Sequence, residues 1–398
     1  MTTKQKPQNR IKIATYSIAK NEEKHVARWL EATKDSDYRI VLDTGSSDAT
    51  VALLKAADNV IVGETKVVPW RFDTARNQAL ALVPEDAEVC LVLDMDEIPE
   101  RHFYRKVQEQ WVPGVKRGLI LIDTAFKWQI DRLHSRDGWV WKWPCHEAAV
   151  RIDGDEEYEY CHIKATISHK PDLTKPRGLY LPMLEAAVIE MPEDPRMWTY
   201  LCREYYYYEK WDKVIEAAEK VLSLDGLDSE LATVCRWAGE ASRSLQKPSR
   251  AWFNRGVELC PTQGEPWLAL AADALRDKEY DLALSSAIEC FEKPKIVHYL
   301  HEPTAWMWKA YDVAAQAAFN LKLLDEALVF AYEAHKAKGP ETERIRRNID
   351  MMEKMKREMR AHSKGSNLGN RQEEKLRISG GPLGLHQVQS NLEETAKV

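Results

Sequence analysis

The sequence lacks the features that mark several large classes of protein. No apolar run approaches the roughly 20 residues that a membrane-spanning helix needs, and residues 1–7 contain no apolar core of a signal peptide. The seven cysteines are scattered singly, without a Cys-x-x-Cys pair. This distribution indicates reduced thiols, and disfavours a disulfide framework or a cysteine zinc site. We therefore expect a cytoplasmic protein, either bacterial or viral in a host cytoplasm.

Two common nucleotide-binding motifs are also missing. Neither Gly-x-Gly-x-x-Gly nor Gly-x-x-x-x-Gly-Lys-Ser/Thr occurs, which disfavours dinucleotide and P-loop chemistry. The formal net charge of −6 gives no support to nucleic-acid binding through a globally basic surface. The 398 residues, 44% of them hydrophobic, are enough for two or three domains with sizeable cores.

Hydrophobic periodicity divides the chain into an α/β part and an all-α part. Apolar runs predict strands at 11–18, 38–42, 59–62 and 88–93. Amphipathic stretches between them predict helices at 22–33, 48–57 and 74–82. This βαβ spacing is typical of a mostly parallel sheet with helices on both faces. Later extended stretches predict an antiparallel addition at 118–128, 139–141, 148–152 and 163–168.

The character of the sequence changes after about residue 191. Apolar positions recur there every three or four residues, which indicates paired amphipathic helices. With Trp267 at the aromatic position of the 34-residue tetratricopeptide (TPR) pattern, Leu270, Ala271 and Ala283 fall at its large and small positions. The repeats are irregular in length, so we expect a short, degenerate solenoid of about four hairpins.

The most informative segment is the apolar run that ends in Asp94, Asp96 and Glu97. Aspartates two apart point to opposite faces of a regular strand, but at a strand end both can reach one divalent cation. A Mg²⁺ or Mn²⁺ ion held there would bind a diphosphate. The alternative is an ordinary loop, since Asp-x-Asp is common in loops.

A second strand is expected to end at Asp43, which is followed by Gly45, Ser46 and Ser47. A carboxylate in this position can receive the donor groups of a nucleoside, while the start of the next helix accepts phosphate. The alternative for Asp43 is a turn residue at a strand end.

Together these segments resemble the family 2 glycosyltransferases. The segments that carry the resemblance are 21–23, 43–48, 70–77 and 94–97. The Phe-x-x-Ala-Arg-Asn segment at 72–77 and Trp-Pro-Cys-His-Glu at 143–147 resemble a branch with lipopolysaccharide-core glucosyltransferases and bacteriocin S-glycosyltransferases. The resemblance implies an α/β GT-A fold, a nucleotide-diphospho-sugar transferase with a Rossmann-like sheet, followed by an all-α TPR-like repeat domain.

The predicted organisation therefore has six parts. They are a disordered N-terminus at 1–10, a GT-A domain at 11–175, a linker at 176–191, TPR-like repeats at 192–340, a charged capping helix at 341–362 and a disordered tail at 363–398. For the capping helix, an amphipathic docking element is the alternative.

The resemblance also implies roles for individual residues in the donor pocket. Asp43 would contact the base or ribose of a sugar nucleotide, which the resemblance implies is UDP-linked. Thr15 and Glu22 would line the same pocket. Arg76 would approach the diphosphate or the sugar, and Asp94 would reach ribose or sugar hydroxyls.

The metal and the catalytic groups follow from the same resemblance. Asp96 would bind the Mn²⁺ or Mg²⁺ ion directly, and His169 would be a later metal or phosphate ligand, with a surface histidine as the alternative. Proton removal from the acceptor needs a general base. The Glu-Asp pair that usually supplies it in this family is not found in its usual place here, so Glu147 is our candidate, with His146 as its orienter or a phosphate donor.

Four tryptophans cluster in the sequence near these groups: Trp128, Trp139, Trp141 and Trp143. Sugars stack their apolar faces on aromatic rings, so Trp139 and Trp141 are candidates for a sugar platform. The alternative for each tryptophan is packing in the core.

The functional hypothesis is a metal-dependent, inverting glycosyltransferase that moves a sugar from a nucleotide-sugar to a large acceptor. The repeats would bind that acceptor, a protein, peptide or glycan, or mediate a homodimer. One alternative acceptor is a hydroxymethylated base in viral DNA, with phosphate contacts from basic residues of 341–362. An alternative of another class is a non-catalytic repeat scaffold with an inactive transferase-like domain.

Overall fold

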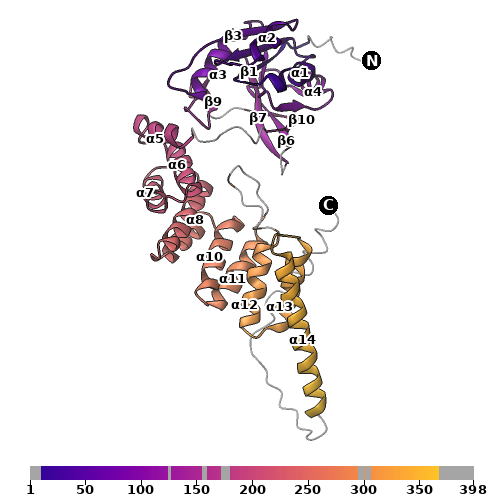
Figure 1. Ribbon diagram of the computed structural model, residues 1–398, viewed down its shortest axis with the longest axis vertical. Coiled ribbons are helices and arrows are strands. Elements are labelled where there is room, and N and C mark those ends of the chain that lie inside the picture. The colour runs from indigo at the N-terminus through magenta and orange to yellow at the C-terminus, as the bar shows by residue number, and fades with distance from the viewer. Residues whose placement is uncertain are drawn as a thin grey trace, which may run out of the picture.

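The protein consists of a sheet unit, residues 10–171, and a helical unit that begins at residue 180. The computed structural model describes residues 10–123, 127–154, 159–171, 180–294, 300, 305 and 307–366. The sheet unit lies at one end of an elongated molecule, and the helices stack away from it along the long axis (Figure 1).

The sheet unit contains one large mixed sheet with the strand order β3-β2-β1-β4-β7-β6-β10-β5. Its strands are β1 Ile13–Ala19, β2 Tyr38–Asp43, β3 Val60–Glu64, β4 Val89–Val92, β5 Glu97–Pro99, β6 Arg117–Asp123, β7 Lys127–Ser135 and β10 Tyr160–His169. Strands β3, β2, β1 and β4 run parallel to one another, whereas β7 is antiparallel to both β4 and β6. Strands β8 Trp139–Lys142 and β9 Ala148–Arg151 form a separate antiparallel pair.

The two faces of the sheet have separate cores because side chains alternate along each strand. Its helices are α1 Glu23–Ala32, α2 Thr50–Lys55, α3 Phe72–Ala81 and α4 Phe103–Gln110. Ile13 of β1 shares a cluster with Trp29 of α1 and Phe103 of α4. Tyr16, three residues further along β1, belongs to the other cluster, with Ala79 of α3 and the β8 tryptophans. Strand β1 is therefore covered on both sides.

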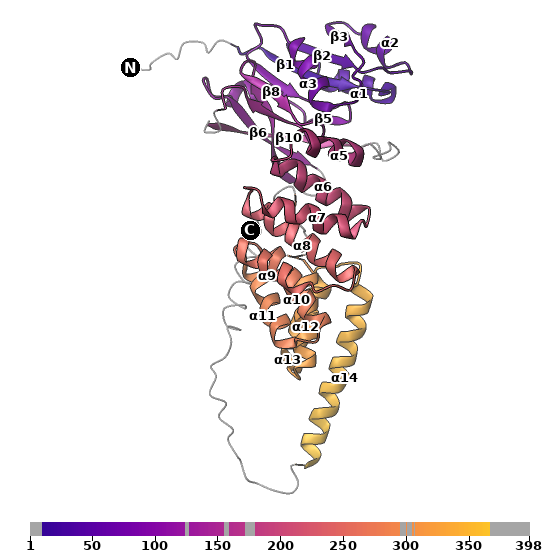
Figure 2. The ribbon, with the colours of Figure 1, turned by 90° about the vertical axis from the view of Figure 1, so that its left-hand side faces the viewer.

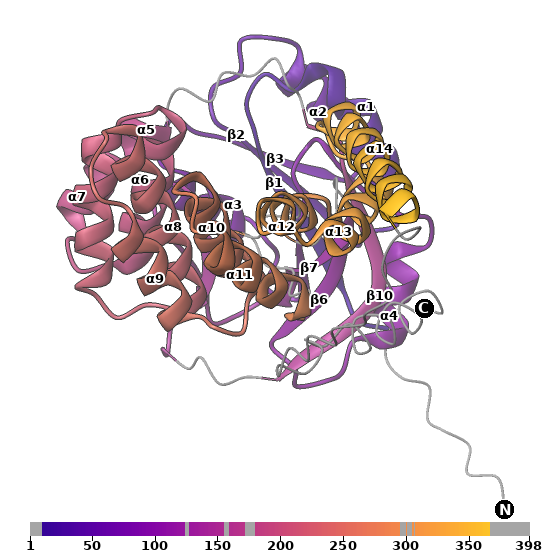
Figure 3. The ribbon, with the colours of Figure 1, turned by 90° about the horizontal axis from the view of Figure 1, so that it is seen from below.

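The helical unit begins with α5 Tyr180–Glu190 and continues as consecutive antiparallel hairpins. The hairpin helices are α6 Pro195–Tyr207 and α7 Trp211–Leu222, α8 Asp228–Ser244 and α9 Arg250–Leu259, α10 Gly264–Arg276 and α11 Tyr280–Glu292, and α12 Lys309–Asn320 and α13 Leu324–Lys336. The last helix, α14 Thr342–Ser366, runs along the end of the stack (Figure 2). Viewed along the stack, successive hairpins are rotated about its axis (Figure 3).

Each hairpin turn is made by the same backbone device. The first helix ends before a non-glycine residue with positive φ, which is Glu209, Gln246, Lys278 or Lys322. The N–H of the next residue then donates to a carbonyl five positions back, as in Lys210 to Tyr205 and Lys247 to Ser242. This is the bond that closes a helix C-terminus in a Schellman motif. Its recurrence at irregular intervals shows that the unit is a degenerate helical repeat, as predicted.

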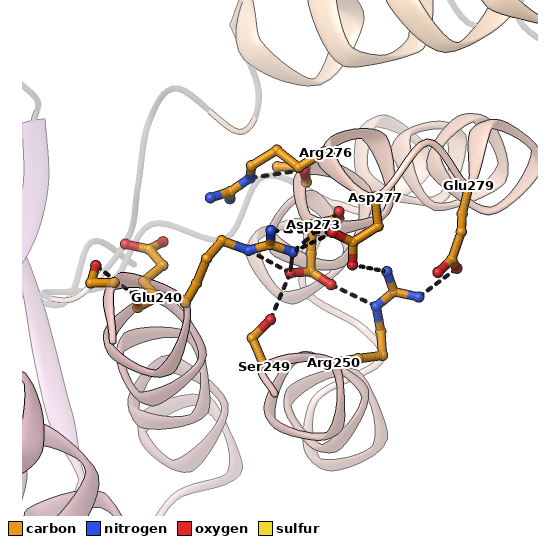
Figure 4. Close-up of polar contacts among 10 residues, drawn as sticks. Glu240, Ser249, Arg250, Asp273, Arg276, Asp277 and Glu279 are labelled. Carbon is orange, nitrogen blue, oxygen red and sulfur yellow. Dashed lines mark hydrogen bonds and ion pairs between the residues drawn. The ribbon is translucent and has the colours of Figure 1, made fainter. Parts of the chain in front are cut away.

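A buried carboxylate ties three repeat helices together. Asp273 of α10 has a fully buried side chain; its Oδ1 accepts from Arg243 Nε of α8 at 2.9 Å, and its Oδ2 accepts from Arg250 Nε of α9 at 2.6 Å. Ser249 Oγ donates to the same Oδ1 at 3.0 Å (Figure 4). Burial alone would raise the pKa of Asp273, but these hydrogen bonds outweigh it and lower the pKa.

The predicted GT-A fold class is wrong for this structure. Most of the described residues are helical, and the sheet is a mixed one in which β7 separates β4 from β6. The sequence motifs specify which residues end a strand, but they do not specify which strand pairs with which. The predicted linker 176–191 also differs, because α5 occupies it from Tyr180 on.

Two other boundaries can be compared directly. The charged helix extends to Ser366, four residues beyond the predicted end. Of the predicted disordered segments 1–10 and 363–398, residues 1–9 and 367–398 lie outside the described residues, and residues 363–366 belong to the last helix. Within the part of the chain that the structure describes, no helix combines the length and apolarity needed to cross a bilayer.

Candidate functional site

The carboxyl edge of the parallel strands carries a buried ionic cluster centred on Arg76. Strand β4 delivers Asp94 to this edge, and α3 places Arg76 beside it, with 2.9 Å between Arg76 Nη2 and Asp94 Oδ1. Arg76 Nε also donates to Glu147 Oε1 at 2.6 Å. One guanidinium thus joins the end of a strand to the loop that precedes β9, while the Arg76 side chain is only 6% exposed.

A second arginine completes the cluster. Arg132 of β7 donates to Glu97 Oε1, and its Nη2 lies 3.6 Å from Asp94 Oδ2. The other Glu97 oxygen, Oε2, accepts the backbone N–H of Asp94 at 3.0 Å. Within the described residues, Arg76 Nη1 and Arg132 Nε are buried donors without a hydrogen-bond partner. Unmet donors of this kind favour an anionic or oxygen-rich ligand.

The charges in this cluster shift its pKa values. Burial would raise the pKa of Asp94, but the charges of Arg76 and Arg132 outweigh it and lower the pKa to about 2. For Glu97 burial dominates, and its pKa is raised despite Arg132. Asp94 is therefore a carboxylate at neutral pH, held in place by two cations.

Asp96 points to a different partner from Asp94. Strand β10 runs antiparallel to β5 with His169 opposite Glu97, and the Lys170 N–H donates to the Asp96 carbonyl at 2.9 Å. This pairing brings His169 Nε2 to 3.4 Å from Asp96 Oδ2. The hydrogen bond to Asp96 raises the pKa of His169, although burial opposes the shift. The structure thus joins two residues that the sequence separates widely.

The residues proposed for the nucleoside pocket are dispersed. Asp43 leaves the sheet at the same edge as Asp94, because β1 lies between β2 and β4. Its Oδ1 accepts from the backbone N–H groups of Gly45 at 2.9 Å and Ser46 at 2.8 Å, which fixes its own turn. Thr15 is buried under α4, where its hydroxyl bonds Tyr104.

Glu22 lies where the loop before α1 meets the loop before α2. Its backbone N–H donates to Thr50 Oγ1 at 2.8 Å. In the same region Asn21, with φ of 55°, accepts the Ser47 N–H at 2.8 Å. The first two strand-to-helix loops therefore hold each other in a fixed arrangement at this edge of the sheet.

Trp139 and Trp141 are packed into the core on the α3 side of the sheet. Trp141 donates its indole N–H to Tyr16 Oη at 2.9 Å and lies under Arg76, whose guanidinium carbon is 5.0 Å from the ring centroid. Trp139 donates to Ser135 Oγ and contacts Arg117. Both rings are less than a tenth exposed, so Trp141 supports the site from beneath through Arg76. The side chain of Trp128 lies outside what the structure describes.

His146 faces the helical unit. Its Nε2 accepts from Arg203 Nη2 of α6 at 2.9 Å, and its carbonyl accepts from Arg196 at 3.0 Å. Its ring stacks on Tyr200 with 4.0 Å between centroids. Burial, reinforced by the two arginines, lowers the pKa of His146 to about 3, so the ring is neutral at neutral pH. The predicted role of Glu147 as general base, with His146 as orienter, stays a prediction.

Comparisons with known proteins concern the repeats. No protein-family model matches the chain, and no curated protein matches it significantly. The crystal structure of MamA is similar, with 17% identity, a TM-score of 0.34, and coverage of 40% of this chain and 90% of its own. TTC0263, a thermophilic TPR protein in Thermus thermophilus, is 16% identical with a TM-score of 0.33, and the match covers 44% of this chain and 91% of TTC0263. YrrB, a TPR protein with an unusual peptide-binding site, is 19% identical with a TM-score of 0.35, and the match covers 44% of this chain and 84% of YrrB.

These likenesses accord with the consecutive helical hairpins, and they provide no support for a family 2 glycosyltransferase domain. The consecutive hairpins of this chain confirm the predicted helical-repeat character, and the mixed strand order corrects the GT-A part of the predicted fold class. Chemistry depends on the side chains of a site and not on the fold that carries them.

Three residues at the site were not predicted from the sequence. Arg132 lies within β7, and Arg196 and Arg203 lie on a repeat helix, far along the chain from the acids. No spacing rule connects them to Asp94 or His146. Glu97 stands beside the two aspartates in the sequence. Its burial in the structure is what distinguishes its role from theirs.

Proposed function

We propose that the sheet edge binds a nucleotide-sugar, UDP-linked, together with Mn²⁺ or Mg²⁺, and that the protein transfers the sugar to a macromolecular acceptor bound by the helical unit. One observation carries this proposal. Asp94 and Asp96 from the end of β4, Arg76 from α3 and His169 from β10 gather around one edge of the sheet. Carboxylates, a histidine and a buried guanidinium are the groups that a sugar diphosphate and its cation require.

The donor set for the cation fits only in part. Among the described residues, no group of three or more His, Cys, Asp and Glu side chains is arranged to hold a metal ion. Asp96 and His169 supply two ligand atoms 3.4 Å apart. Cations such as Mg²⁺ commonly bind through one or two carboxylates plus substrate phosphates and water. The pair therefore suits a cation that arrives with the diphosphate.

The chain's own residues would divide the chemical work. A bound cation would neutralise the charge that develops on the leaving diphosphate. Arg76, with its buried Nη1 donor, would add a fixed positive charge at the same place. Asp94 would accept from sugar or ribose hydroxyls. Glu147 would take the acceptor proton, and in doing so would have to act while bonded to Arg76 Nε.

The helical unit favours a protein, peptide or glycan acceptor over DNA. The alternative of a hydroxymethylated DNA base relied on basic residues of the last helix. Most of these are ion-paired within the helical unit, namely Arg344 with Asp312, Arg346 with Glu343, Lys356 with Asp325 and Arg357 with Glu353. Paired cations offer less net charge to phosphates, so this alternative loses its main support.

A non-catalytic repeat scaffold is the second candidate. The observation in its favour is that Arg76, Arg132, Asp94 and Glu147 largely satisfy one another in a compact ionic cluster. Such a cluster is also a way to stabilise a sheet edge without any ligand. The comparisons with solved structures accord with a repeat scaffold as well.

A turnover assay separates these candidates. Sugar nucleotides are screened with cell extract as the source of acceptor, and mass spectrometry locates the transferred sugar. We expect a metal-dependent mass increase that Asp96→Asn abolishes and Asp137→Asn, a change at an 86% exposed carboxylate, leaves intact. No transfer and no metal-dependent hydrolysis of any sugar nucleotide would leave the scaffold as the function.

A further inference from the structure

We propose that Arg203 and Arg196 of α6 are positioning residues for the sheet-edge site, and that they act through His146 on Glu147 and Arg76. The inference rests on the proposed function for its catalytic consequence. The structural part of the proposal does not depend on that function: the first repeat helices complete the site and are not an appended binding module.

Helix α6 holds the His146 loop through both the side chain and the backbone. Arg203 donates to the ring Nε2 at 2.9 Å, and Arg196 donates to the carbonyl oxygen at 3.0 Å. The ring of His146 lies between two tyrosines of the helical unit, with 4.0 Å to the Tyr200 centroid and 5.3 Å to that of Tyr180. These contacts fix the position and the plane of the imidazole.

The same loop is anchored at its other end. Trp143 donates its indole N–H to Asp194 Oδ2 at 2.6 Å, and the other oxygen of Asp194 caps the start of α6 by accepting the Met197 N–H. Trp143 has φ of 77° and His146 has φ of 51°. Non-glycine residues avoid this region unless their surroundings impose it. Contacts with α6 provide that constraint at both positions.

The fixed position of His146 also restrains the ionic cluster around Arg76. Glu147 is the next residue, and its carboxylate bonds Arg76, which in turn bonds Asp94. The first residue of α3, Phe72, donates its N–H to the Pro144 carbonyl at 2.8 Å and stacks on Tyr180 of α5. The loop and α3 are therefore held by the same helices, so Arg76 has little freedom to move independently.

Apolar packing is continuous where the loop at 143–147 meets α5 and α6. The buried Cys145 belongs to one apolar cluster with Leu184 of α5 and Tyr200 of α6, and Phe72 and Trp143 pack against it. Helices α5 and α6 lie directly against the sheet unit in the side view (Figure 2). The repeat unit thus reaches the site through packed side chains, which is the physical requirement for coupling the two.

The test uses full-length protein with Arg203→Met, Arg203→Lys and the control Arg255→Met. Arg255 is a 54% exposed arginine that pairs only with Glu258 among the ion pairs described for it. Hydrogen exchange is measured for peptides covering 71–81 and 141–150, without any ligand. We expect faster exchange there in Arg203→Met, with β1 and β2 unchanged, partial recovery in Arg203→Lys, and no change in Arg255→Met.

Catalysis provides the second readout. We expect Arg203→Met to lower kcat/KM about tenfold or more, because small displacements of positioned groups are costly. In the double variant with Glu147→Gln, the losses in kcat/KM should not multiply, because both changes act through the same carboxylate. Unchanged exchange at 71–81 and 141–150 in Arg203→Met, or multiplicative kinetic effects, would overturn the proposal. Altered exchange in a protein that turns over no sugar nucleotide would overturn the proposed function and keep the structural link.

Discussion

Arg76 Nε and Glu147 Oε1 lie 2.6 Å apart, although 71 positions separate the two residues in the chain. This contact links α3 to the loop before β9, and the other end of the same guanidinium reaches Asp94. A single side chain therefore sets the mutual positions of the carboxylates on which the proposed chemistry depends.

Replacing Arg76 tests this arrangement. In Arg76→Met, Asp94 and Glu147 lose their shared cation while remaining partly buried, and uncompensated buried charge is strongly destabilising. We expect the free energy of unfolding to fall by about 3 kcal/mol in urea denaturation. Arg105→Met, at a 70% exposed arginine paired with Glu109, should change it by less than about 0.5 kcal/mol. Equal effects of the two changes would show that Arg76 does not organise the cluster.

Replacing Glu147 tests the assignment of the general base. Glu147→Gln keeps an oxygen for Arg76 Nε and removes the ability to take a proton. We expect kcat to fall by about 100-fold or more with little change in KM for the donor. Glu109→Gln, at a carboxylate 58% exposed, is the matched control. A kcat within twofold of the wild type would assign the base elsewhere.

Replacing Asp273 tests the separation of stability from function. Asp273→Asn removes the charge that Arg243 and Arg250 share, so we expect a loss of about 2 kcal/mol in thermal unfolding. Nucleotide binding should be unaffected, because the cluster lies within the repeats. Asp277→Asn, at a 45% exposed carboxylate of the same cluster, should cost far less. A loss of nucleotide binding without unfolding would contradict this separation.

The lowered pKa of His146 predicts how the free energy of unfolding depends on pH. Its folded-state pKa of about 3 lies below the ordinary value of 6.5, so the unfolded chain binds a proton that the folded chain does not. Its contribution to stability is complete above pH 6.5 and is lost as the pH falls toward 3. The slope for one proton is at most about 1.4 kcal/mol per pH unit.

The variant His146→Gln keeps an acceptor for Arg203 and removes this titration. We expect its free energy of unfolding to decline less steeply than that of the wild type between pH 6.5 and pH 4, as followed by urea denaturation. Parallel pH profiles for the two proteins would show that His146 does not titrate in this way.

Part of the site could be predicted from the sequence because it depends on local rules. Apolar runs that end in acids place Asp43 and Asp94 at strand ends, and the parallel strands bring both to one edge. The hairpins could be predicted for the same reason, since helical periodicity requires no knowledge of distant contacts. The four hairpin turns close with the same backbone bond although the repeats differ in length.

The rest depends on contacts between distant parts of the chain. Strand β7 inserts between β4 and β6, and this places Arg132 beside Glu97 and makes the sheet mixed. The register of β10 against β5 brings His169 to Asp96. The orientation of His146 toward Arg203 follows from the packing of α6 on the loop at 143–147. No spacing within the sequence encodes these pairings.

The proposed function requires that the sheet edge bind a nucleoside diphosphate together with a divalent cation. Calorimetric titration of UDP into the full-length protein, with and without Mn²⁺, measures this binding. We predict saturable binding at one site that requires Mn²⁺, that Asp96→Asn abolishes and that Asp137→Asn retains. Absence of Mn²⁺-dependent UDP binding to the wild type, or equal binding to Asp96→Asn, would show that the sheet edge is not a metal-dependent nucleotide site.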